Sequence, residues 1–227
     1  MSKVRKFAVF IALAITGIGF FTKVYSQENF YVDEPRVFYG GLIGGVNIAQ
    51  VDGDNFAGYD KIGVNVGAIV YAQLKEHVAL SLEILYSQKG SKSNIVRETF
   101  VDNRPVYIES YAIKVNYAEI PVMINYFDKR KSHAGIGLSY SQLVSSSETL
   151  QILDQNALSN VDLTKYAFKK VDLNILAGVE LHLWQGLFLN VRFQYSLLPI
   201  RTDIPPNYSR ANQYNNLWVV RLMYLLK

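Results

Sequence analysis

The chain has 227 residues, no cysteine, 16 tyrosines and a formal net charge of +4. The absence of cysteine excludes a disulfide framework and a lipid-anchored cysteine after an export signal. The basic balance comes from the first 26 residues, which hold four basic and no acidic side chains; without them, 19 basic residues face 19 acidic ones. The net charge therefore gives no reason to expect nucleic acid as a partner.

The N-terminus has the three parts of a secretory signal peptide. Residues 1–6 are basic, residues 7–21 carry no charge, and the small residue Ser26 ends the segment. We expect residues 1–26 to be removed on export and residues 27–35 to form a short periplasmic leader. A retained anchor is the weaker alternative, because a spanning helix needs roughly 20 apolar residues.

A period-two alternation organises the rest of the chain. In Lys61–Gly90, aliphatic side chains occupy every second position on both sides of a tight turn at 75–77. Such alternation indicates two strands, because successive side chains of a strand point to opposite faces. Each run has 12 to 14 residues, whereas a strand of a globular protein has about 5–6. A tilted strand needs roughly 9–11 residues to cross a bilayer, so we predict a transmembrane hairpin.

The same pattern predicts eight strands in total. They span residues 36–50, 61–74, 78–90, 109–127, 132–145, 168–184, 187–200 and 214–227. Their connections alternate between longer ones (51–60, 91–108, 146–167, 201–213) and short ones (75–77, 128–131, 185–186). Outer-membrane barrels have an even number of strands, short periplasmic turns and longer external loops. We therefore predict an all-β fold, an eight-stranded antiparallel up-and-down transmembrane β-barrel over residues 36–227.

One strand contains a change of phase. In residues 109–127 the apolar positions are odd-numbered up to Tyr117 and even-numbered from Ala118. A β-bulge produces a one-residue shift of this kind, and Pro121, which cannot donate to a ladder, lies just beyond it. We predict a bulge at 117–119; the alternative is a strand that ends and restarts there.

The two faces of the strands differ in composition. The stripe that holds the charged side chains also holds most glycines, and the other stripe is rich in Leu, Val and Ile. An eight-stranded barrel has an interior just wide enough to be filled by side chains. We therefore place the charged and glycine stripe inside, since exposing Arg192 or Arg221 to lipid near the midplane would cost about 2–4 kcal/mol. A soluble lipocalin-like barrel would reverse the two faces.

Charged side chains of the inner stripe are expected to pair in the lumen, because a buried charge needs a partner. The predicted lumen ion-pair network consists of Glu83, Lys89, Lys114, Glu119, Asp172, Glu180, Arg192 and Arg221. The favoured interpretation is an ion-paired plug that stabilises the barrel. A narrow polar passage is the alternative.

Catalysis has little support in the sequence. The residues that could imitate a hydrolase triad are His133, His182, Ser139, Ser141 and Glu180. No nucleophile motif accompanies them, and neither a metal-ligand spacing nor a phosphate-binding loop is present. We expect a protein that is not an enzyme and that holds no cofactor or metal.

Four segments occur together in the order of a known family. They are the glycine-rich first hairpin from Gly40, EILYSQKG at 83–90, YAEIP at 117–121 and FQYSLLPI at 193–200. From about Tyr39 to the C-terminus, the chain resembles the outer-membrane β-barrel domain of PorT-like proteins, common in Bacteroidota. The resemblance implies a barrel in the cell outer membrane, surrounded by lipid and inserted by the barrel-assembly machinery.

The resemblance also implies a role. The named member of the family is linked to protein secretion through the type IX system. We therefore expect a non-enzymatic protein with a structural or interaction role, an accessory of secretion that contacts other envelope proteins through the external loops 91–108 and 146–167. The alternatives are an outer-membrane enzyme that modifies lipid or peptide, and a narrow diffusion pore.

Overall fold

The computed structural model describes residues 37–54, 56, 58–94, 96–101, 104–128, 131–152, 166–202 and 209–226. The predicted signal peptide and the leader that follows it lie outside these residues. No helix in the described ranges is long and apolar enough to cross a membrane.

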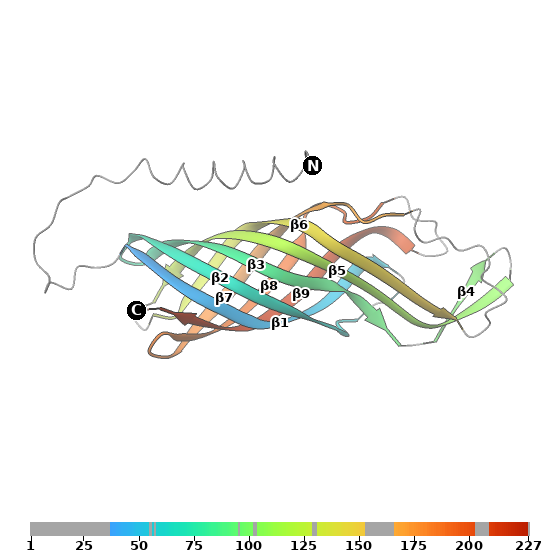
Figure 1. The fold of residues 1–227 in the computed structure, drawn as a ribbon, viewed down its shortest axis with the longest axis horizontal. Helices are drawn as coiled ribbons and strands as arrows, with labels where there is room; N and C mark the ends of the chain where they lie inside the picture. The colour runs from blue at the N-terminus through green and yellow to red at the C-terminus, as the bar shows by residue number, and fades with distance from the viewer. Residues whose placement is uncertain are drawn as a thin grey trace, which may run out of the picture. The chain divides into compact units, whose positions relative to one another are not determined.

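The described chain consists of antiparallel strands. They are β1 (Phe38–Asp54), β2 (Lys61–Lys75), β3 (Val78–Ser93), β4 (Arg97–Val101), β5 (Arg104–Phe127), β6 (His133–Ile152), β7 (Val171–Trp184), β8 (Leu187–Ser196) and β9 (Ser209–Leu225). Eight of them form a ring in the order β3-β2-β1-β9-β8-β7-β6-β5, which closes because β5 also pairs with β3 (Figure 1). The predicted eight-stranded antiparallel barrel is confirmed. The remaining strand, β4, lies outside the ring and pairs with the first residues of β5.

Side chains alternate between the lumen and the outer surface as the sequence pattern predicts. On β2 and β3, Ile62 and Ile84 are 68% and 66% exposed, whereas Asn65 and Glu83 are buried. The aliphatic stripe therefore covers the outside of the barrel, and the mixed polar stripe fills the inside.

An apolar band surrounds the barrel. On β3 the outward apolar side chains alternate along a stretch of nine residues, from Val78 to Tyr86. This length matches the roughly 9–11 residues of a membrane-spanning strand. Tyr86, Tyr140 and Trp218 lie at one edge of this band, and the next outward residues along their strands are polar, for example Gln88. The aromatic side chains therefore mark the outer edge of the hydrocarbon layer.

The strands on one side of the barrel continue well beyond this edge. β5 has 24 residues and β6 has 20, compared with 10 in β8, and β4 lies at the far end of β5 (Figure 1). We call β4 together with residues 104–116 and 144–152 the outer extension. The predicted loops at 91–108 and 146–167 are thus partly strand, because the polar segments satisfy their backbone groups by pairing with one another.

The predicted bulge at 117–119 is wrong, and β5 neither ends nor restarts there. From Tyr111 to Asn125, the odd-numbered side chains of β5 are all buried, on both sides of Tyr117. The irregularity lies in β6, where Asn116 pairs with Ser145 but Tyr117 pairs with Leu143. The change of phase in the sequence has another cause: the apolar residues before Ala118 pack inside the barrel.

Apolar side chains close the lumen at both ends. The outer cluster comprises Val51, Phe56, Ile108, Tyr111, Ile113, Val115, Tyr117 and Ile200. The inner cluster comprises Ile43, Ile69, Tyr71, Ala79, Leu85, Phe188 and Met223. Polar and charged side chains occupy the space between these two clusters, and they form the candidate site.

Candidate functional site in the barrel lumen

The structure places most of the expected network inside the barrel. Residues that are at most 4% exposed are Glu83, Lys89, Glu119, Asp172, Glu180, Arg192 and Arg221. The expected inward position of Lys114 is wrong. Because the phase of β5 does not change, Lys114 lies on the outer surface, exposed to solvent.

Glu83 of β3 forms the centre of the network. Arg192 of β8 donates from Nη1 to Oε2 (3.1 Å) and from Nη2 to Oε1 (2.6 Å). Arg221 of β9 donates to the same two oxygens over 2.9 and 2.8 Å, and its Nε donates to Asn190 Oδ1 over 2.8 Å. One carboxylate thus binds two guanidinium groups in the bidentate geometry that gives strong, directional pairs. These contacts connect strands from separate parts of the ring.

A second pair joins β3 to β5. Lys89 Nζ lies 3.3 Å from Glu119 Oε2 and 3.3 Å from Asn174 Oδ1. Glu119 Oε1 accepts hydrogen bonds from Ser139 Oγ (2.7 Å) and Gln194 Nε2 (2.5 Å). The carboxylate therefore has both a cation and neutral donors around it, which offsets the cost of its burial.

Asp172 is held differently. Its Oδ2 accepts from Ser196 Oγ and from Asn215 Nδ2, each over 2.9 Å. In the described part of the chain, no Lys or Arg nitrogen lies within 4.0 Å of this carboxylate. Asp172 belongs to the hydrogen-bond network and does not form a direct ion pair.

Glu180 forms a third cluster beside the inner apolar side chains. Its Oε2 lies 2.7 Å from His133 Nε2 and accepts from the Tyr71 hydroxyl over 2.6 Å. His133 Nδ1 lies 3.2 Å from the Lys131 carbonyl oxygen, and its ring stacks on Phe127 at 4.0 Å. Both ring nitrogens of His133 therefore lie within hydrogen-bond distance of an oxygen atom.

The structure does not bring the expected hydrolase residues together. His133 contacts Tyr71 and Glu180, whereas Ser139 donates to Glu119. His182 lies near the β7–β8 turn, where its Nε2 is 2.7 Å from the Gln185 carbonyl oxygen. No described histidine is hydrogen-bonded to a serine hydroxyl through its ring, so the geometry lacks the nucleophile–base contact of a triad. Nor do three or more His, Asp or Glu side chains of the described ranges group as metal ligands.

Comparison with protein families gives a clear result. The family model described as outer membrane protein beta-barrel domain matches residues 25–201. The chain belongs to this family. Its membership indicates the outer membrane as the location of the barrel, in agreement with the apolar band.

Solved structures with a similar fold are also outer-membrane barrels. Ail, the attachment invasion locus protein of Yersinia pestis, is 10% identical with a TM-score of 0.44, over 83% of this chain and 98% of that chain. Neisserial surface protein A is 10% identical with a TM-score of 0.41, over 83% and 97%. Outer membrane protein AlkL is 12% identical with a TM-score of 0.37, over 89% and 97%. Comparison with curated proteins gave no match.

The outer-membrane barrel also contains a buried Arg–Glu pair that the sequence pattern did not predict. Arg201 Nη1 lies 2.9 Å from Glu148 Oε2, and the Tyr111 hydroxyl donates to the same carboxylate. Burial and the adjacent Glu148 charge raise the pKa of Tyr111. Both members of the pair were assigned to loops, and Glu148 faces inward only because β6 continues past its irregularity.

The polar centre of the outer-membrane barrel is therefore enclosed on every side. Strands surround it, and the inner and outer clusters cover its ends. The side chains inside are largely paired with one another, so the interior resembles a packed core more than a channel.

Proposed function

We propose that this outer-membrane barrel is non-enzymatic and acts by contact with other envelope proteins through its outer extension, as an accessory of protein secretion. The observation that carries the proposal is the combination of a filled lumen with an extension built from paired strands. A barrel whose described residues form neither a passage nor an assembled catalytic set can act through what it touches. The link to secretion rests on the resemblance to PorT-like proteins.

The outer extension offers a defined surface for a partner. Glu98 on β4 and Tyr107 on β5 are exposed, and β4 pairs with β5 from Arg97↔Ile108 to Val101↔Arg104. This hairpin can be removed with little effect on the ring. Among the described residues, those from 98 to 107 pair only with one another, and the single pairing lost beyond them is that of Arg97 with Ile108.

Photo-crosslinking in living cells tests the proposal. A photoreactive residue at Glu98 or Tyr107 is expected to capture the same envelope protein, whereas one at Leu74, exposed in the apolar band, captures none. Replacing residues 97–107 by a Gly-Ser linker should leave the barrel in the membrane and reduce secretion as far as deletion of the whole gene does. Unchanged secretion in the deletion strain would reject the accessory role.

The enzyme alternative has its own test. His133→Ala and His182→Ala should each support secretion at the level of the wild type when the assembled protein is present in equal amount. A loss of function without a loss of assembled barrel would favour a chemical role for the histidine concerned.

A further inference from the structure

Three lysines gather just beyond the outer edge of the apolar band. Lys92 of β3 pairs with Ala112 of β5, and Lys114 of β5 pairs with Gly90 of β3. The two lysines are diagonal neighbours on adjacent strands, a separation of about 7–8 Å that long side chains bridge easily. Lys61 is the first residue of the adjoining strand β2. We call Lys61, Lys92 and Lys114 the lysine patch.

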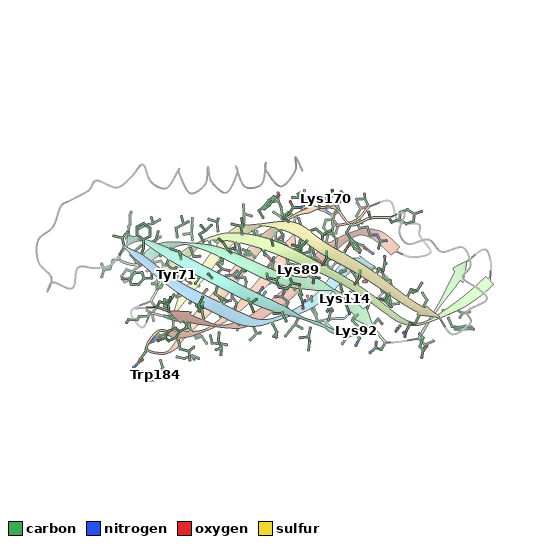
Figure 2. All side chains as sticks on the ribbon, viewed as in Figure 1. Tyr71, Lys89, Lys92, Lys114, Lys170 and Trp184 are labelled. Atoms are coloured by element: carbon green, nitrogen blue, oxygen red, sulfur yellow. The ribbon has the colours of Figure 1, made fainter. Side chains whose placement is uncertain are left out.

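The lysine patch lies on the wall of the barrel near the membrane. Lys92 and Lys114 are exposed and lie toward the end of the barrel that carries β4, opposite the end with Tyr71 and Trp184 (Figure 2). On β5, Lys114 precedes Ala118, the first outward residue of the apolar band, by four positions. Lysine side chains at this height can bend toward lipid headgroups.

The positive charges of the lysine patch are not neutralised by the protein. Among the residues that the structure describes, no carboxylate oxygen lies within 4.0 Å of any of the three amino groups. Burial, followed by the charges of Lys114 and Lys92, lowers the pKa of Lys61. The three cations therefore repel one another, and an anion between them would relieve that repulsion.

Neutral hydrogen-bond donors surround the charges. Lys114 pairs with Ser147 of β6, and the neighbouring pair is Asn116 with Ser145. These two are hydrogen-bonded through Asn116 Nδ2 and Ser145 Oγ over 2.8 Å and lie on the exposed side. A surface that combines ammonium groups with hydroxyl and amide donors suits phosphate oxygens.

We propose that the lysine patch binds the phosphate groups of an anionic lipid in the outer leaflet of the membrane. The patch lies beside the hydrocarbon edge and not at the tip of the outer extension. From this position its ammonium groups can reach the headgroups of the surrounding lipids. Basic side chains next to a membrane favour anionic lipids by an amount that corresponds to about fivefold for each lysine. The inference is independent of any role in secretion.

Lipid selectivity next to the patch can be measured with the full chain. Ala118 is exposed beneath the patch, so Ala118→Trp in a Trp184→Phe, Trp218→Phe background places one fluorophore there. The protein is reconstituted in phosphatidylcholine that contains a small fraction of brominated phosphatidylglycerol or, separately, brominated phosphatidylcholine. Quenching is expected to be several-fold stronger for the brominated anionic lipid than for the neutral one, and the difference should shrink with added salt.

Matched variants assign the selectivity to the patch. Lys92→Gln with Lys114→Gln should remove most of the preference, and adding Lys61→Gln should remove the remainder. The control, Lys75→Gln with Lys131→Gln, removes two exposed lysines at the opposite end and should leave the preference unchanged. Because Lys75, Lys92, Lys114 and Lys131 are exposed and Lys61 is half-buried, chemical unfolding should show nearly equal stability among the variants.

Two results would overturn the inference. One is a preference that persists when all three lysines are glutamine, or that falls equally in the control. The other is a preference abolished by inorganic phosphate at matched ionic strength, which would show a site for free phosphate instead of a lipid headgroup.

Discussion

Replacing Glu83 by glutamine tests whether the lumen network stabilises the barrel. The change keeps the size of the side chain but removes the negative charge that two buried guanidinium groups share. Four charged hydrogen bonds, from 2.6 to 3.1 Å, end on this carboxylate. Removing one partner of a buried ion pair costs about 3–5 kcal/mol, because the remaining charge stays buried without compensation. We expect Glu83→Gln to lower the free energy of unfolding by about that amount.

The assay is denaturant unfolding of the barrel in lipid vesicles, followed by tryptophan fluorescence. Glu76→Gln serves as the control, since the Glu76 side chain is 90% exposed and such substitutions change stability by about 0.5 kcal/mol or less. In a double-mutant cycle with Arg192→Gln, the double variant should lose less unfolding free energy than the sum of the two single losses. The expected difference is about 1 kcal/mol or more. A cost for Glu83→Gln below about 1 kcal/mol, with additive singles, would refute the idea of a dry, coupled network.

Further predictions concern the packing of two glycines, the contrast between Lys89 and Lys114, and ion conduction. Gly137→Ala should destabilise strongly, because an added Cβ would lie 2.1 Å from a β5 carbonyl oxygen; Gly44→Ala, with nothing within 4 Å, should unfold like the wild type. Lys89→Met should cost about 3–5 kcal/mol in unfolding free energy by breaking its buried pair, whereas Lys114→Met should cost about 0.5 kcal/mol or less. Planar-bilayer recordings should show no stable conductance, because both ends of the lumen are filled; steady single-channel steps would contradict this.

Much of the barrel could be predicted from alternation alone. The hairpin β2–β3, the inward Glu83 and the outward Ile84 follow directly from a period of two, which has no other geometric explanation in runs this long. The pairing of specific charges could not be predicted in the same way. Glu83 and Arg192 are 109 residues apart, and their contact depends on the stagger of the whole ring.

The length of the strands was harder to predict, because a polar segment of a membrane barrel can be either a loop or a strand that continues beyond the lipid. The segments 91–93 and 146–152 look like loops when strands are sought by their apolar stripe, although they belong to β3 and β6. Beyond the hydrocarbon layer, however, an outward serine or lysine is an ordinary residue on the water-facing side of a sheet. Composition therefore marks the end of the lipid layer and not the end of the strand.

The change of phase in β5 follows from the same physical fact. Within the membrane, lipid is the apolar phase, so residues such as Ile120 and Ile124 point outward. Above the membrane, water surrounds the sheet and the apolar phase must be inside, so Tyr111 and Ile113 point inward. The stripe changes sides although the backbone continues without a break, because the solvent changes and the strand does not. A one-residue inversion of alternation in a long barrel strand therefore indicates where the hydrocarbon layer ends, and only a register shift in the pairing itself, as at Asn116 and Ser145, indicates a bulge.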